Sequence, residues 1–155
     1  MRGRVIRFSC LLFLLQSCAT RKGVEFDAFI RSDGMVLRSP SSGKVYLVSN
    51  GQRHYVPGPG VMEALGIVCL PRDVDDSLMD SVPLGADMPM LTTKVVQNPQ
   101  TKEVFLLECG KRRYVPDPQT ISALNLESAV RPLQPDQINL IPVGPPLPHA
   151  GGVKP

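Results

Sequence analysis

The segment that decides the fold runs from residue 45 to residue 57 and reads Val45-Tyr46-Leu47-Val48-Ser49-Asn50-Gly51-Gln52-Arg53-His54-Tyr55-Val56-Pro57. Two runs rich in β-branched, aromatic and other apolar residues flank an Asn-Gly pair. Asn-Gly is a strong hairpin signal because both central residues of a type I′ turn need a positive φ angle. The segment therefore predicts a β-hairpin with strands at 45–48 and 53–56.

The same pattern returns further along the chain as Val104-Phe105-Leu106-Leu107-Glu108-Cys109-Gly110-Lys111-Arg112-Arg113-Tyr114-Val115-Pro116. Position 45 aligns with position 104, and a constant offset of 59 residues holds without a gap as far as Met88-Pro89 on Leu147-Pro148. A register kept over so many positions indicates a tandem duplication.

Each copy predicts the same order of elements. A leading strand (35–38; 94–97) precedes the hairpin, and a short helix (60–65 in the first copy) follows it, with Gly66 or Asn125 in a left-handed cap. A second helical turn is expected after Asp75-Asp76 or Pro135-Asp136, and a closing extended segment at 84–90 or 143–147. We expect a β-rich α+β fold of two tandem 59-residue ββα-like repeats that lie side by side, with strand sharing between them left open.

The hairpin register brings six candidate binding residues onto two equivalent faces. Pairing across the turn places Tyr46 opposite Tyr55, with Arg53 on the same face. The second copy places Phe105, Tyr114 and Arg112 in the same way. Two interpretations remain open: a cross-strand aromatic contact inside the core, with the arginine stacked at its rim, or a platform for a sugar face or a peptide carboxylate.

The N-terminus has the order of a secretory signal. Arg2, Arg4 and Arg7 precede an apolar run over residues 8–15, and small or polar residues follow it. The run is much shorter than the ~20 residues that a membrane-spanning helix needs. We expect a signal peptide at 1–17, a linker at 18–33, repeats at 34–92 and 93–148, and a flexible tail at 149–155.

Leu15-Gln16-Ser17-Cys18 resembles the lipobox of bacterial lipoproteins, in which the chain is cut before the cysteine. The resemblance implies that Cys18 carries diacylglycerol and an N-acyl chain, such as palmitate, and that Ala19 directs the protein to the outer membrane of a diderm cell. Several acyl chains give stable anchoring where one is marginal. Ordinary cleavage after Ala19, which would leave a secreted chain, is the alternative.

Cys69 and Cys109 are the two cysteines that remain after the signal region and Cys18. An even pair in an oxidising compartment can form a disulfide, which here would join one repeat to the other. The alternative is two unrelated thiols. Neither cysteine has a second Cys or a His at metal-ligand spacing, so no metal site is expected.

Composition and missing motifs exclude several classes of function. Outside the first seven residues the chain has 14 basic and 14 acidic residues, so it lacks the positive charge typical of a nucleic-acid binder. No catalytic or cofactor motif is present, and we expect neither an enzyme nor a cofactor. The replacement of His54 by Arg113 in the second copy predicts an exposed hairpin position.

Both copies also resemble a small repeat of bacterial cell-surface and secreted proteins, which carries the pattern Val-Tyr-Leu-Val-x-Asn-Gly-x-Arg-x-Tyr-Val-Pro. The resemblance implies an extracellular accessory module with no assigned ligand. Three hypotheses follow. The first is a non-catalytic envelope lipoprotein that binds cell-wall glycan or an envelope protein. The second is a structural component of an envelope complex, and the third is a hydrolase with an unfamiliar site.

Overall fold

The computed structural model describes residues 27–150. The predicted signal peptide and Cys18 lie outside this range. The chain divides into two units, residues 1–30 and 31–155, and only residues 27–30 of the first are described, as a helical turn. Both repeats belong to the second unit. No helix of the described part is long and apolar enough to cross a membrane.

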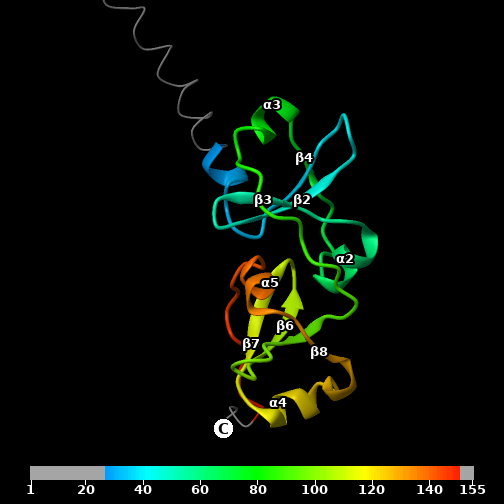
Figure 1. The fold of residues 1–155 in the computed structure, drawn as a ribbon, viewed down its shortest axis with the longest axis vertical. Coiled ribbons are helices and arrows are strands. Elements are labelled where there is room, and N and C mark those ends of the chain that lie inside the picture. Colours follow the sequence, from blue (N-terminus) through cyan, green and yellow to red (C-terminus); the bar gives the residue numbers. More distant parts are fainter. Residues whose placement is uncertain (1–26, 151–155) are drawn as a thin grey trace, which may run out of the picture. The chain divides into compact units, whose positions relative to one another are not determined.

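The fold is α+β and β-rich, with two four-stranded sheets in two similar halves, as the sequence predicts (Figure 1). The first sheet has the order β3-β2-β1-β4 and the second the order β7-β6-β5-β8. Both have the same topology, and no strand is shared between them within residues 27–150. The bounds of the first sheet are β1 Val36–Arg38, β2 Val45–Ser49, β3 Gln52–Tyr55 and β4 Arg72–Asp73, and those of the second are β5 Val95–Gln97, β6 Val104–Glu108, β7 Lys111–Val115 and β8 Val130–Pro132.

The two hairpins confirm the predicted register. Tyr46 pairs with Tyr55 in the first copy, and Phe105 with Tyr114 in the second. The turn residues have the left-handed φ angles of a type I′ turn, 52° and 71° in the first copy and 51° and 71° in the second. Cys109-Gly110 thus makes the same turn as Asn50-Gly51 despite the loss of asparagine.

Short helices connect the strands. They are α2 Pro59–Ala64, α3 Asp76–Met79, α4 Pro118–Ala123 and α5 Pro135–Asn139, with a 3₁₀ turn η1 at Glu127–Ala129. Gly66 and Asn125 have φ angles of 64° and 53°, which confirms the left-handed cap predicted for α2 and α4. Asp75 occupies the N-cap of α3, but its side chain makes no capping hydrogen bond.

Two features of the sheets were not predicted. A short strand after α2 or η1, β4 or β8, pairs in parallel with the leading strand β1 or β5. The closing segment then runs parallel to the hairpin edge, where Arg53 bridges Leu84 and Arg112 bridges Val143. The closing segment therefore covers the outer edge of each hairpin.

The two repeats share one hydrophobic core. A single cluster of buried side chains combines Leu47, Leu65 and Ile67 of the first copy with Leu107 and Ile141 of the second. The second copy has an additional cluster of its own around Val95, Val104 and Val115. Since each repeat alone is smaller than the roughly 70–80 residues that a comfortable single core needs, the shared cluster explains how two short units fold together.

The hairpin turns also join the repeats. The amides of Cys109 and Gly110 donate to the carbonyls of Gly66 and Leu65, both at 3.0 Å. In the opposite direction, the side-chain amide of Asn50 donates to the carbonyl of Asn139 at 3.4 Å. Each turn thus contacts the end of a helix that belongs to the other copy.

Candidate binding surfaces

The six residues predicted for binding form two nearly identical groups of three. The rings of Tyr46 and Tyr55 meet edge to face with centroids 5.9 Å apart, and those of Phe105 and Tyr114 at 6.0 Å, both at an interplanar angle of 61°. Arg53 lies over Tyr46 at 5.4 Å, measured from its Cζ to the ring centroid, and Arg112 over Phe105 at 5.7 Å. The duplication therefore preserves the whole aromatic–arginine group.

Each arginine also holds a helix against its hairpin. Arg53 donates to Asp80 at 2.8 Å, at the end of α3, and its side chain is only 13% exposed. Arg112 donates to the side-chain oxygen of Asn139 at 2.9 Å and to the carbonyl of Ile138. Burial lowers the pKa of the Arg112 guanidinium below its usual value, and the charge of Glu103 partly opposes this shift.

The ring faces are only partly open to solvent. Tyr46, Tyr55 and Phe105 are half-buried, and Tyr114, at 39% exposure, is the most open of the four. In addition, the Lys44 ammonium lies 5.7 Å from the centroid of the Tyr55 ring. The rings therefore contribute to packing in both copies, and Tyr114 alone has a substantially exposed surface.

His54 is buried, at 2% exposure, so the prediction of an exposed hairpin position was wrong. Its Nδ1 lies 2.7 Å from the carbonyl oxygen of Ala86 in the closing segment, and its Nε2 lies 3.4 Å from that of Ser49. Arg113 makes the corresponding contact in the second copy, where its Nε donates to the carbonyl of Pro145 at 3.0 Å. His54 and the equivalent Arg113 are both polar because each hydrogen-bonds a carbonyl of the closing segment. The two positions differ in burial, since His54 is buried and Arg113 is partly exposed.

Cys69 and Cys109 are free, exposed thiols, so the structure does not contain the predicted disulfide. Cys109 lies in the tight hairpin turn, where its amide is bonded to Gly66 of the other copy. Cys69 lies three residues beyond Gly66 in an exposed loop. The repeats are joined here by backbone hydrogen bonds rather than by a covalent bond.

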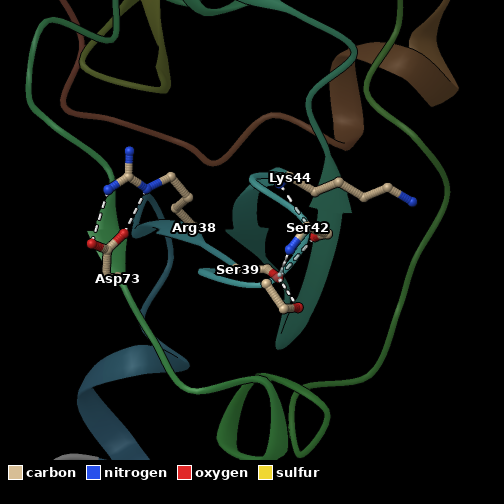
Figure 2. Close-up of polar contacts among 6 residues, drawn as sticks. Arg38, Ser39, Ser42, Lys44 and Asp73 are labelled. Carbon is tan, nitrogen blue, oxygen red and sulfur yellow. Dashed lines mark hydrogen bonds and ion pairs between the residues drawn. The ribbon is translucent and has the colours of Figure 1, made fainter.

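Two acidic residues of the first copy, Asp73 and Asp80, pair with arginines. Asp73 of β4 accepts two hydrogen bonds from Arg38 of β1, at 2.6 and 2.9 Å (Figure 2). This hydrogen bonding lowers the pKa of the Asp73 carboxyl below its usual value. Beside the pair, the hydroxyl of Ser39 accepts hydrogen bonds from the amide and the hydroxyl of Ser42 and shapes the turn that leads into β2 (Figure 2).

The C-terminal residues that the structure describes lie against α4. Nδ1 of His149 is 2.8 Å from the Asp117 carboxylate, and the amide of Ala150 donates to Thr120. Asp117 is the N-cap of α4, and the bond that it accepts from the Thr120 amide is the main cause of its lowered pKa. Within residues 27–150 no group of three or more His, Cys, Asp or Glu side chains could hold a metal ion.

An apolar loop that the sequence patterns did not single out is the most exposed hydrophobic surface of the described chain. Val68 and Leu70, on either side of Cys69, are 88% and 93% exposed. Two grooves of about 270 Å³ each lie beside this apolar loop (Val68–Leu70), and Gly66, Val68 and Lys94 line both. The aligned positions in the second copy are Glu127 and Ala129. A comparison of the two copies at these positions could therefore have identified the loop from the sequence.

No known protein family and no curated protein matches this chain. The chain is similar in structure to a chain of the periplasmic assembly from the ESX-5 inner membrane complex, with a TM-score of 0.32 and 14% identity over 77% of this chain and 43% of that chain. It is also similar to a chain of an intact ESX-5 inner membrane complex, with a TM-score of 0.32 and 15% identity over 90% of this chain and 42% of that chain. A third similar chain is in the EccB3 dimer from the ESX-3 core complex, with a TM-score of 0.30 and 17% identity over 73% of this chain and 42% of that chain. The chain spans less than half the length of these proteins, and at these TM-scores its function has to be derived from its own residues.

Proposed function

We propose that this protein is a non-catalytic module of the cell envelope, anchored by lipid at Cys18, that docks an envelope protein through the apolar loop Val68–Leu70. The observation that carries the proposal is the difference between the two copies at this loop. The first copy exposes Val68 and Leu70, whereas the second has Glu127 and Ala129 at the same positions. An exposed apolar patch of this kind is typical of interaction sites.

The neighbouring grooves indicate the chemistry of the partner. Besides the three residues common to both, Met62 and Ile67 line one groove, and Leu106 and Leu107 line the other. The lining of the two grooves also carries charges of both signs, from Lys94, Glu63 and Glu108. A groove with apolar walls and a balanced rim favours an uncharged, apolar segment of a partner protein over a polyanion or a polycation.

The geometry of the aromatic groups supports a protein partner over cell-wall glycan. A glycan platform needs open ring faces, and here each arginine lies over one ring while the paired ring meets it edge on. Tyr114 is the exception, since its exposure would allow it to stack on a sugar. Glycan binding at Tyr114 is therefore the second candidate.

Photocrosslinking in intact cells tests the docking surface. A photoreactive amino acid replaces Val68 in one full-length variant and Glu127 in another. We expect one discrete protein adduct from position 68 and none from position 127. Adducts of equal yield from both positions, or none from position 68, would overturn the proposal.

Two further measurements test the remaining parts of the proposal. Labelling with a palmitate analogue should mark the wild-type chain and leave Cys18→Ser unmarked, and an unlabelled wild type would exclude the lipid anchor.

A pull-down tests the glycan candidate. Residues 19–155 should not be retained on purified cell-wall sacculi. Retention that is lost in Tyr114→Ala would favour the glycan candidate instead.

A further inference from the structure

A polar pocket of about 270 Å³ lies where the two copies meet. Its polar lining consists of Asn50 from the first copy, Asp33 from the residue directly before that copy, and Arg112 and Asn139 from the second copy, and its apolar wall is the segment 141–143. The backbone amide of Asn50 donates to the Asp33 carboxylate at 2.8 Å, which fixes that carboxylate. The pocket thus lies at the contact between the hairpin turn of the first copy and the end of α5 in the second.

The charge of Arg112 in this pocket is not neutralised by a neighbouring carboxylate. Its NH1 donates to the carbonyl of Ile138 and the amide oxygen of Asn139, both of which are uncharged acceptors. Within residues 27–150 no carboxylate lies within ion-pair distance of it, although the equivalent Arg53 pairs with Asp80. A single Asp-to-Asn difference between the copies therefore leaves a half-buried guanidinium without an ion-pair partner, and the charge of Glu103 acts on it only from beyond ion-pair distance.

The rest of the guanidinium is available to a ligand. The described residues provide no hydrogen-bond acceptor for its Nε or NH2, and neither atom is among the fully buried, unpaired ones, unlike Nε of Arg53. Desolvation lowers the pKa of Arg112, which indicates that its charged form lacks full compensation within the protein. A carboxylate is the group whose geometry matches two adjacent N–H donors of a guanidinium.

We infer that this pocket binds a carboxylate that carries an N–H donor beside it, as in a peptide C-terminus or an α-amino acid. The carboxylate pairs with Arg112, and the side-chain amides of Asn50 and Asn139 lie in the same pocket as further polar partners. Asp33, also in the lining, accepts the adjacent N–H and disfavours ligands that have only negative charge. This site is separate from the proposed docking function, since it requires neither the lipid nor the apolar loop.

Nuclear magnetic resonance on residues 19–155, labelled with ¹⁵N, tests the inference directly. The probes are N-acetyl-Ala-Ala with a free carboxylate, the same peptide as its C-terminal amide, free alanine, and acetate. We expect saturable shifts of the Arg112 Nε–H and of the Asn50 and Asn139 side-chain amides with a carboxylate ligand, and none with the peptide amide.

The probes also separate the two sources of the carboxylate. A response to the dipeptide but not to alanine identifies a peptide C-terminus, and a response to alanine at least as strong identifies a free amino acid. If acetate binds as well as both, the part of the inference that concerns Asp33 is wrong. The absence of any saturable shift at Arg112 would overturn the whole inference.

Two variants provide matched controls. Asn139→Asp gives Arg112 the internal carboxylate that Arg53 already has, so it should weaken binding roughly tenfold or more while the hydrogen bond to NH1 persists. Asp80→Asn makes the mirror-image change in the first copy and should leave binding at Arg112 unchanged. Undiminished binding by a folded Asn139→Asp variant would contradict the inference. Arg112→Lys keeps the positive charge but loses the paired N–H donors of the guanidinium, so it should also bind the carboxylate more weakly.

Discussion

The two copies of the repeat differ least in their apolar packing and most in their polar partners. The aromatic pairs have the same interplanar angle and centroid distances that differ by only 0.1 Å, at 5.9 and 6.0 Å. By contrast, Arg53 pairs with an aspartate and Arg112 with an asparagine, and the exposed Val68 corresponds to Glu127. Interior packing constrains both copies, because one shared cluster draws on both, whereas the polar and exposed positions differ between them.

The largest expected effect comes from the shared core. Leu107 belongs to the second copy but packs in the cluster that joins both copies, so Leu107→Ala should destabilise the protein by about 2–5 kcal/mol. Chemical denaturation measures this change, and probes placed in each copy should lose structure together. Leu106→Ala, a neighbouring half-buried site that packs on the cluster of the second copy alone, is the control with a smaller effect. Loss of structure in the second copy only would contradict a shared core.

The helix caps should respond differently in the two copies. At Gly66 a Cβ atom would lie 2.9 Å from the carbonyl oxygen of Leu107, and the φ angle of 64° disfavours any side chain. Gly66→Ala should therefore cost about 1–3 kcal/mol through strain and displacement of the other copy. Asn125→Ala, at the equivalent exposed cap, should cost about 1 kcal/mol or less. Equal losses measured by thermal unfolding would show that Gly66 is not tightly packed against the second copy.

The contacts that fasten the closing segments should also differ in strength. His54→Ala removes a buried ring and leaves the Ala86 carbonyl without its 2.7 Å partner, so we expect a loss of about 1–3 kcal/mol. Arg113→Ala removes a partly exposed contact and should cost about 0–1 kcal/mol. The free energies of unfolding of both variants test which substitution destabilises more. A larger loss for Arg113→Ala than for His54→Ala would contradict the greater strength of the buried contact.

The smallest expected effect is the pH dependence of the Arg38–Asp73 pair, which has no equivalent in the second copy, where Gln97 and Pro132 occupy these positions. Hydrogen bonds from Arg38 depress the pKa of Asp73 in the folded state, so the pair stabilises the fold above the unfolded carboxyl pKa of about 3.9 and the contribution disappears as the pH falls. Arg38→Gln introduces the residue of the second copy, Gln97. The difference in unfolding free energy between wild type and variant should shrink from pH 6 to pH 3. A difference that grows on acidification would have the wrong sign.

Local patterns in the sequence are sufficient to predict the hairpins. The Asn-Gly turn and the alternation on either side of it fix the register, and the constant offset transfers both to the second copy. The same patterns group the six aromatic and arginine residues correctly. Whether these residues bind a ligand is still a prediction, because their packing role and a binding role use the same side chains.

Long-range pairing accounts for most of what the sequence did not predict. Strands β4 and β8 are two or three residues long and pair in parallel with a distant strand, which leaves little periodicity to recognise. The burial of His54 depends on the closing segment that folds over it, more than 30 residues away. The pocket around Arg112 and the grooves beside Val68 draw residues from both copies, and no pattern within one copy indicates either.

We infer that the two copies form one folded unit, because the shared core and the pocket at Arg112 both require it. Amide hydrogen exchange at Cys109 and Gly110 tests this most directly, since these amides donate to carbonyls of the other copy. We predict protection comparable to that of the central strands β2 and β6. Rapid exchange at both amides, with the strands still protected, would show that the copies separate readily and would contradict the claim.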